Sequence, residues 1–288
     1  MSKKPRKRPV KRPGAGKRPS LAERADIHDL YQRSVQSPEA DCEFFAETFA
    51  ALRGRPALRL REDFCGTAHM ATTWCKGHPE RSAVGVDLDA ATLEWGRVHN
   101  LAPAGPAVAS RVTLIHGDVR EASAPLADMT CAMNFSFCVF KARAELRAYF
   151  EAVRRGLRED GVFLAEIYGG TEAIDVLEEE REVGPHTYVW EQERYDPIDH
   201  STTCHISFTM SDGSKIERAF SYEWRLWSLP ELRELLLEAG FREVKIFWEE
   251  VGPDEDDPEM LRGTGTYVEL RSLDENQESW LAYVVALA

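Results

Sequence analysis

The chain has 288 residues, 43% of them apolar and 30% charged, as in an ordinary globular protein. Its net charge is −13, and because residues 1–20 carry nine Lys or Arg and no acid, the rest of the chain is more acidic still. Such an acidic body is a poor nucleic-acid surface, since phosphate binding depends on basic patches.

No stretch of the sequence reaches the roughly 20 apolar residues of a membrane span, and the start lacks an apolar signal core. We therefore expect a cytoplasmic protein without a membrane partner. The six Cys contain no CxxC pair and are spread over predicted core elements, so we expect free thiols and no metal site. These residues are Cys42, Cys65, Cys75, Cys131, Cys138 and Cys204.

Residues 1–20 are rich in Lys, Arg, Pro and Gly, which bury little, so this segment is predicted to be a disordered basic tail. A solubilising tail, a nucleic-acid tether and a localisation signal all remain open for it. Residues 21–55 are predicted to be an N-terminal helical segment, with Ser20 or Asp26 capping a start. Four apolar side chains recur there at helical spacing and should be buried: Phe44, Phe45, Phe49 and Leu52.

Residues 56–170 alternate between short apolar runs and segments of helical length. The strand candidates are 57–60, 82–89, 111–119, 127–140 and 162–170, and the helix candidates are 69–77, 90–102 and 143–160, the last stopped by Gly161. Such alternation is typical of βαβ units around a parallel sheet. We predict an α/β fold with a mostly parallel sheet, helices on both faces and an antiparallel β insertion, and residues 56–170 are its core.

Residues 171–227 have a different pattern, which predicts the antiparallel insertion, either an added sheet or a lid. Polar and apolar residues nearly alternate over 186–197, 202–210 and 215–227, and SDGS at 211–214 predicts a hairpin.

Residues 228–288 are expected to complete the α/β core. A helix is predicted over 228–240, with Ser228 as its cap and Gly240 at its end. Strands over 241–250 and 264–273 are joined by an acidic loop at 252–259, and 278–288 is an apolar helix or strand.

Acidic side chains stand at the ends of the first three predicted strands: Glu62 and Asp63, then Asp87, then Asp118. The carboxyl ends of parallel strands share one edge of a sheet, where ligands bind at the topological switch point. One acid there can accept both hydroxyls of a ribose, and another can accept an adenine amino group. The phosphate-binding pattern G-x-G-x-x-G is absent, and an acid beside the first turn suits a cation. We therefore expect a positively charged nucleoside.

These segments together resemble the motifs of class I (Rossmann-like) S-adenosylmethionine-dependent methyltransferases, whose first motif has an acid two residues before Gly-Cys-Gly-Thr-Gly. The resemblance covers residues 57–170, where REDFCGTA, VGVDLD and HGDV occur in order. It implies a Rossmann-like, mostly parallel seven-stranded sheet with helices on both faces and an antiparallel β insertion. It also implies S-adenosyl-L-methionine as cofactor and residues 56–170 as the cofactor-binding α/β core. By position it implies that the methionine part contacts Glu62, Cys65, Gly66 and Thr67, that the ribose is bound by Asp87 beside Leu88, and that the adenine lies near Asp118 and Val119.

The sequence departs from that family's first motif at two positions, because Phe64 and Ala68 replace the first and last glycines. A tighter turn would exchange the roles of Glu62 and Asp63, so Asp63 stays a cofactor-binding candidate. After the second strand, Asp89 stays an alternative to Asp87 for the ribose.

Methyl transfer needs an aligned nucleophile, and it needs a base only where the acceptor must lose a proton. The catalytic candidates are Tyr31, before the first strand, and Asn134, Glu166 and Tyr168, where the fourth and fifth strands end. Asn134 is also a cofactor-binding candidate.

The insertion is rich in aromatic residues, which form either sheet core or a lid over an acceptor pocket in which Arg225 holds an anionic group. Its place in the chain is similar to that in glycine N-methyltransferase and in small-molecule sugar N-methyltransferases. This resemblance implies a small-molecule methyl acceptor.

Two alternatives remain open. The enzymatic alternative is methylation of nucleic acid or protein. Many methylases of nucleic-acid bases carry Asn-Pro-Pro-Tyr after the fourth strand, and this chain has the asparagine, Asn134, but Phe-Ser-Phe in place of the other three residues. A catalytically inactive cofactor-binding protein, or an RNA-tethered partner protein using the basic tail, is the alternative of another class. The sequence does not indicate the oligomeric state.

Overall fold

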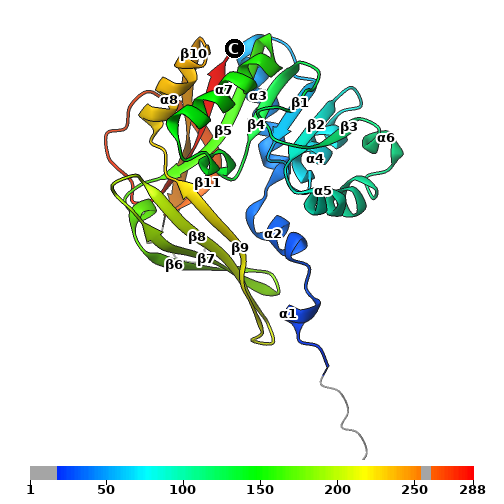
Figure 1. Ribbon diagram of the computed structural model, residues 1–288, viewed down its shortest axis with the longest axis vertical. Helices are drawn as coiled ribbons and strands as arrows, with labels where there is room; N and C mark the ends of the chain where they lie inside the picture. The colour runs from blue at the N-terminus through cyan, green and yellow to red at the C-terminus, as the bar shows by residue number, and fades with distance from the viewer. Residues whose placement is uncertain (1–17, 254–260) are drawn as a thin grey trace, which may run out of the picture.

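A computed structural model describes residues 18–253 and 261–288. The predicted tail therefore lies outside the described residues up to position 17, and so does the acidic loop from 254 onward. Within the described chain, helices and strands form an α/β core with a second, smaller sheet beside it (Figure 1).

The core is an eight-stranded sheet in the order β11-β10-β12-β5-β4-β1-β2-β3. Its parallel part consists of β1 (Arg59–Asp63), β2 (Ser82–Asp87), β3 (Val112–His116), β4 (Ala127–Ala132) and β5 (Leu157–Gly169). The antiparallel part consists of β10 (Glu243–Pro253), β11 (Leu261–Leu270) and β12 (Trp280–Leu287). The predicted Rossmann-like sheet is confirmed, but it has eight strands instead of seven, because β11 extends the edge.

The last strand explains an ambiguity in the sequence. Residues 278–288 were expected to be an apolar helix or strand, and β12 is a strand inserted between β5 and β10. Its residues are buried from Ala282 to Leu287 on both faces of the sheet, so its sequence is continuously apolar instead of alternating.

Helices cover both faces of the sheet. On one face, α7 (Arg143–Gly156) and α8 (Leu229–Glu238) share a core that contains Tyr149, Phe163 and Leu235. On the other face, α3 (Pro38–Arg53), α4 (His69–Gly77) and α5 (Ala90–Gly96) surround Phe45 and Trp74. The remaining helical turns are η1 (Arg97–Leu101), α6 (Pro106–Ala109), η2 (Ser136–Val139) and η3 (Glu172–Ile174).

One helix boundary was predicted wrongly. The helix expected over 143–160 ends at Gly156, and residues 157–160 already belong to β5. Leu157 is buried opposite Ala127 of β4, and the pairing resumes at Val162 after a bulge. Burial of Leu157 against the sheet therefore overrides the helical pattern, and Gly161 lies inside the bulge instead of ending a helix.

The insertion forms a four-stranded antiparallel sheet between β5 and α8. Its strands are β6 (Leu177–Val183), β7 (His186–Tyr195), β8 (Ser201–Met210) and β9 (Lys215–Arg225), in that order. Three of these strands and the hairpin were predicted. The fourth, β6, was missed because its inner five residues are all exposed at the sheet edge, so it lacks the alternation of a half-buried strand.

The N-terminal segment supplies two short helices before α3. Ser20 caps α1 (Leu21–Arg24) and Asp26 caps α2 (Ile27–Val35), so both predicted caps are confirmed. In Figure 1, α2 and the smaller sheet lie on the same side of the core, the side toward which β5 ends. None of the helices in the described chain is long and apolar enough to cross a membrane. All six Cys are buried free thiols.

Candidate active site

The turn after β1 keeps a glycine-like backbone although two glycines are replaced. Phe64, Gly66 and Ala68 have φ angles of 58°, 51° and 54°, in the left-handed region that side chains disfavour. The Phe64 ring packs at 5.5 Å from the ring of Tyr149 and 5.9 Å from that of Phe140. Core packing thus holds Phe64 in a conformation that glycine would adopt freely.

The carboxylate at the end of β2 faces this turn. Asp87 accepts a hydrogen bond from the Gly66 N–H at 2.7 Å and another from the Asp89 N–H at 2.9 Å. Asp89 instead caps α5, accepting from the N–H groups of Ala91 and Thr92. Beside Asp87, the Leu88 side chain is 67% exposed, an apolar group at the rim of the sheet. Asp87, not Asp89, is therefore placed to accept from a ligand above the turn.

Glu62 and Asp63 point to opposite faces of β1. Glu62 is 4% exposed and accepts from the Ala71 N–H in the first turn of α4 at 2.8 Å. Asp63 accepts from Arg61 Nε at 2.7 Å and from the Tyr149 hydroxyl at 3.1 Å, within the core under α7. The structure thus disagrees with Asp63 as a cofactor ligand, because its carboxylate is bonded inside the core. Desolvation raises the pKa of Glu62 to about 8 and that of Asp63 to about 6.

Arg61 and Arg120 hold the segment that follows β3. Arg120 grips the Asp118 carboxylate at 2.6 Å, and this hydrogen bond keeps the pKa of Asp118 below its usual value. Val119 is buried, and its carbonyl accepts from Arg61 Nη2 at 2.5 Å. Asp118 and Val119 are therefore placed at the edge of the sheet by two arginines that the sequence analysis did not identify.

Thr67 joins the turn to two helices. Its hydroxyl accepts from Gln32 Nε2 of α2 at 2.6 Å, and its carbonyl accepts from Asn100 Nδ2 of η1 at 2.9 Å. A Cβ on Gly96 would lie 2.2 Å from that carbonyl, so this close approach requires glycine. The Cys65 side chain is buried against Gly85, so only its backbone can face a ligand. Gln32, Gly96 and Asn100 had no motif that marked them.

Three of the predicted catalytic residues, Asn134, Glu166 and Tyr168, lie near the ends of β4 and β5. Asn134 and Phe135 have φ angles of 51° and 59°, and the Asn134 N–H donates to Glu166 at 2.8 Å. Glu166 is 9% exposed, and burial raises its pKa to about 8. The Tyr168 hydroxyl is buried beside the Cys204 thiol, and the Tyr168 ring lies 4.6 Å from that of Phe135.

Tyr31 reaches this region from α2. Its ring lies 5.0 Å from Phe220 of β9, and its hydroxyl interacts with that of Tyr222. Burial raises the pKa of Tyr31 to about 12, and the charge of Glu166 acts in the same direction. Tyr31 therefore lies between the insertion and β5.

Arg225 was predicted on the acceptor side and Asp41 was not, and both have partners within the fold. Arg225 pairs with Glu231 at 2.8 Å and lies over the Trp227 ring at 3.7 Å, so it is not free to hold an anionic group. Conversely, Asp41 of α3 was not predicted, yet it accepts from the Tyr283 hydroxyl at 2.7 Å and its charge acts on both Glu62 and Glu166.

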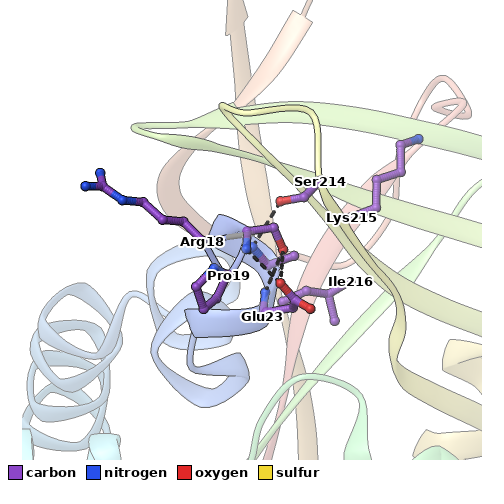
Figure 2. Close-up of a pocket in the computed structure, with 8 residues that line it drawn as sticks. Arg18, Pro19, Glu23, Ser214, Lys215 and Ile216 are labelled. Carbon is purple, nitrogen blue, oxygen red and sulfur yellow. Dashed lines mark hydrogen bonds between the residues drawn. The ribbon is translucent and has the colours of Figure 1, made fainter. Parts of the chain in front are cut away.

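Two hollows on the described surface lie away from the strand ends. One, of about 630 Å³, is lined by Arg18–Ser20, Ala22, Glu23 and the hairpin residues Ser214–Ile216 (Figure 2). The other, of about 410 Å³, is lined by residues that include Lys141, His200 and Arg225. Apart from Arg225, neither hollow is lined by a predicted site residue, so the site is assigned from the residues at the strand ends.

The carboxyl ends of β1 to β5 thus place one set of side chains along one edge of the sheet. Glu62 lies in β1, Asp87 ends β2 and Asp118 follows β3, while Glu166 lies in the last part of β5. Desolvation and neighbouring acids oppose ionisation of Glu62 and Glu166. These residues belong to a Rossmann-like α/β fold and make this edge of its sheet acidic.

Comparison with known proteins identifies solved structures that share this fold. No protein-family model matches the sequence, and no curated protein matches it. An S-adenosylmethionine-dependent methyltransferase from Clostridium acetobutylicum superposes with a TM-score of 0.62 at 16% identity, covering 90% of this chain and 96% of that one.

Two other solved structures cover both chains almost fully. CalS10 with bound S-adenosylmethionine, an amino pentose methyltransferase from Micromonospora echinaspora, gives a TM-score of 0.62 at 18% identity over 91% of this chain and 95% of its own. The sugar N-methyltransferase KedS8 from a Streptoalloteichus species gives 0.56 at 16% identity over 97% and 98%. The chain therefore has the fold of S-adenosylmethionine-dependent methyltransferases.

Proposed function

We propose that this protein is an S-adenosylmethionine-dependent methyltransferase that acts on a small-molecule acceptor. The observation that carries the proposal is the Asp87 carboxylate, which faces the turn after β1 beside exposed Leu88, with Glu62 buried under the same turn. Two carboxylates around a turn disfavour a phosphate ligand and favour a cationic nucleoside.

The residues present fit this cofactor. Asp87 would accept the ribose hydroxyls, Leu88 would pack on the adenine, and Asp118 would lie at the adenine end. Glu62, together with the backbone of Cys65, Gly66 and Thr67, would surround the methionine part. When bound, the cofactor supplies an electrophilic methyl group on a positively charged sulfur.

The chain's own residues mainly position the reactants. The Asn134 N–H donates to the Glu166 carboxylate, and we place the Tyr31 and Tyr168 hydroxyls among the groups that would line the acceptor side. Orientation of two reactants in one site can supply about 7–11 kcal/mol of the barrier reduction. Tyr31, Asn134, Glu166 and Tyr168 are accordingly the residues that we assign to the acceptor.

A small acceptor is supported by the way this edge is enclosed. The α2 helix joins the turn after β1 through Gln32 and joins β9 through Tyr31, so the insertion and α2 flank the site from two sides. The solved neighbours include an amino pentose methyltransferase and a sugar N-methyltransferase. We extend to this chain the small size of those acceptors, not their identity.

Titration calorimetry with S-adenosylmethionine tests the cofactor site. Wild type should bind, and Asp87→Asn should weaken affinity by about 10- to 100-fold, because a hydrogen bond to a charged group is replaced by a weaker one. Asp89→Asn is the matched control, since Asp89 caps α5. No binding by folded wild type at near-millimolar ligand would remove the proposed function.

Labelled methyl transfer tests the acceptor class. Wild-type protein and labelled S-adenosylmethionine are mixed with the metabolite, RNA and protein fractions of a cell extract. Label should enter the metabolite fraction. Label only in RNA or protein would favour the alternative enzymes, and cofactor binding without any transfer would favour an inactive binding protein.

A further inference from the structure

A buried guanidinium ties β1 to the segment that follows β3. Arg61 is 4% exposed, and strand alternation puts its side chain on the face of β1 opposite that of Glu62. Its Nη2 donates to the Val119 carbonyl at 2.5 Å, and its Nη1 donates to the Ala122 carbonyl at 3.3 Å. These carbonyls lie 58 and 61 residues further along the chain, so one side chain joins two segments that no local pattern connects.

The segment that Arg61 holds is a turn that begins at Asp118. The N–H groups of Glu121 and Ala122 donate to the Asp118 carbonyl at 3.0 and 2.9 Å. Residues 118–122 belong to no helix or strand, so no ladder of backbone hydrogen bonds fixes the turn against the sheet. Arg61 does so instead, because it bonds the carbonyl groups near both ends of the turn.

Two other buried groups fix the plane of the guanidinium. Arg61 Nε donates to one oxygen of Asp63 at 2.7 Å, and the Tyr149 hydroxyl donates to the other oxygen at 3.1 Å. Asp63 is 1% exposed and Tyr149 is fully buried. Because the guanidinium is planar and is bonded at all three nitrogens, it cannot turn without breaking a buried hydrogen bond.

Stability alone does not explain this buried pair of charges. Removal of two charges from water costs several kcal/mol for each ion, and apolar residues of similar volume are often at least as stable. Desolvation raises the pKa of Asp63 to about 6 although the charge of Arg61 opposes that rise. What Arg61 adds beyond an apolar side chain is therefore the fixed position of the turn after β3.

We propose that Arg61 is a positioning residue that makes the cofactor site selective for adenine. It acts through the turn that carries Asp118 and Val119, and its own side chain stays in the core. A carboxylate attracts the amino group of adenine and repels the carbonyl that replaces this group in hypoxanthine, so the selectivity depends on where Asp118 is held. Arg120 orients the Asp118 carboxylate within the turn, whereas Arg61 fixes the turn to β1.

The inference rests on the proposed function and adds a residue to which the resemblance in sequence assigns no role. Two ligands that differ at one position of the base test it. We would titrate S-adenosylhomocysteine and S-inosylhomocysteine into the protein by calorimetry. Wild type should bind the adenine ligand at least about tenfold more tightly, as expected for a site that bonds an amino group. Equal affinities in wild type overturn the proposal.

A double variant separates selectivity from stability. Arg61→Met combined with Asp63→Leu removes both charges and leaves an apolar core, so this variant should fold. Its preference for the adenine ligand should fall to about threefold or less, because the turn is no longer held. A smaller fraction of folded protein lowers the number of sites for both ligands equally and leaves the ratio of affinities unchanged. A wild-type ratio in the folded double variant overturns the assignment.

A conservative variant keeps the test open if the double variant does not fold. Arg61→Lys keeps a positive charge beside Asp63, but one ammonium group cannot reproduce three hydrogen bonds made in one plane. The adenine preference should therefore decrease at least about threefold while the charge pair remains. A preference equal to that of wild type in folded Arg61→Lys contradicts the positioning role.

The matched control is an Arg–Asp pair at the other end of β1. Arg55 bonds Asp128 at 2.9 Å, and Asp128 accepts from the N–H groups of Leu58 and Arg59, where β1 begins. Arg55→Met should lower the Tm and leave the adenine preference within about twofold of wild type, because no segment of the site is attached to this pair. An equal loss of preference in Arg55→Met would show general destabilisation and overturn the proposal.

The two levels of the hypothesis fail in different ways. If folded wild type binds neither S-adenosylmethionine nor S-adenosylhomocysteine, the proposed function is refuted. If wild type binds both and its adenine preference survives in the Arg61 variants, only the role of Arg61 is refuted.

Discussion

At the scale of single residues, the turn after β1 has a left-handed backbone conformation at positions that glycine does not occupy. Ala68 has a left-handed φ of 54° and no exposed surface, so its methyl group gains packing but costs conformational energy. A non-glycine residue in this conformation costs about 1–2 kcal/mol, and a buried methyl contributes about 0.8 kcal/mol. The cost exceeds this gain by up to about 1.2 kcal/mol, and glycine would add about 0.4–1 kcal/mol of unfolded-chain freedom, so alanine and glycine are nearly equivalent at this position.

Replacing Ala68 by glycine tests this balance. Ala68→Gly should change the free energy of unfolding by less than about 0.5 kcal/mol, because relief of strain offsets the lost packing. Ala71→Gly, at an equally buried position inside α4, should lower it by about 1–2 kcal/mol, since glycine is unfavourable in a helix. Urea titration measures both, and an equal loss in the two variants would contradict the assigned strain.

Single residues also show which parts of the site could not be predicted from the sequence. The acids after β1 were identified from REDFCGTA, and strand alternation places Glu62 and Asp63 on opposite faces. Which face holds the ligand depends on Arg61 and on Tyr149, which is 86 residues away from Asp63. The same holds for Asp41, whose partner Tyr283 lies 242 residues along the chain. Local spacing carries no information about such contacts.

At the scale of elements, α1 and α2 connect the two sheets. The α1 N–H groups of Leu21 and Ala22 donate to Asp212 and Ser214 at the hairpin between β8 and β9, close to the hollow in Figure 2. Asp26, the cap of α2, also accepts from Trp95 Nε1 of α5 at 2.7 Å. The caps were predictable from sequence, but these contacts were not, because the partners are far away in the chain.

Removal of the α2 cap should loosen this connection selectively. Asp26→Ala removes two cap bonds and the bond to Trp95, and loss of a cap costs about 1–2 kcal/mol. Amides of α1 and α2 should therefore exchange with deuterium about tenfold faster, while those of β1 and β4 stay unchanged. Asp29→Ala, which removes only an exposed pair with Arg33 in the same helix, is the control. Uniform acceleration over the whole chain would show that α2 is not a separate unit.

At the scale of the whole molecule, two buried carboxyl groups make the stability of the fold depend on pH. The pKa values of Glu62 and Glu166 are raised to about 8 from an ordinary 4.5, mainly by desolvation. The folded state therefore keeps protons that the unfolded chain has already lost at neutral pH. This contribution to stability is complete below the unfolded pKa and disappears as pH rises through about 8.

Ligand-free protein should consequently lose stability between pH 7.0 and 8.5. Each of the two carboxyls should account for about 1 kcal/mol over that interval, and together they should lower the Tm by about 5 °C. The raised pKa values of the buried thiols act in the same direction, and burial of His69 and His186 affects mainly lower pH, so neither reverses the trend. Thermal unfolding measured by circular dichroism at both pH values tests the slope. Glu62→Gln and Glu166→Gln should each remove about half of this decrease in Tm, and the control Glu223→Gln should keep all of it. A wild-type Tm that is constant or rises over this interval would show that both acids are already ionised in the folded protein.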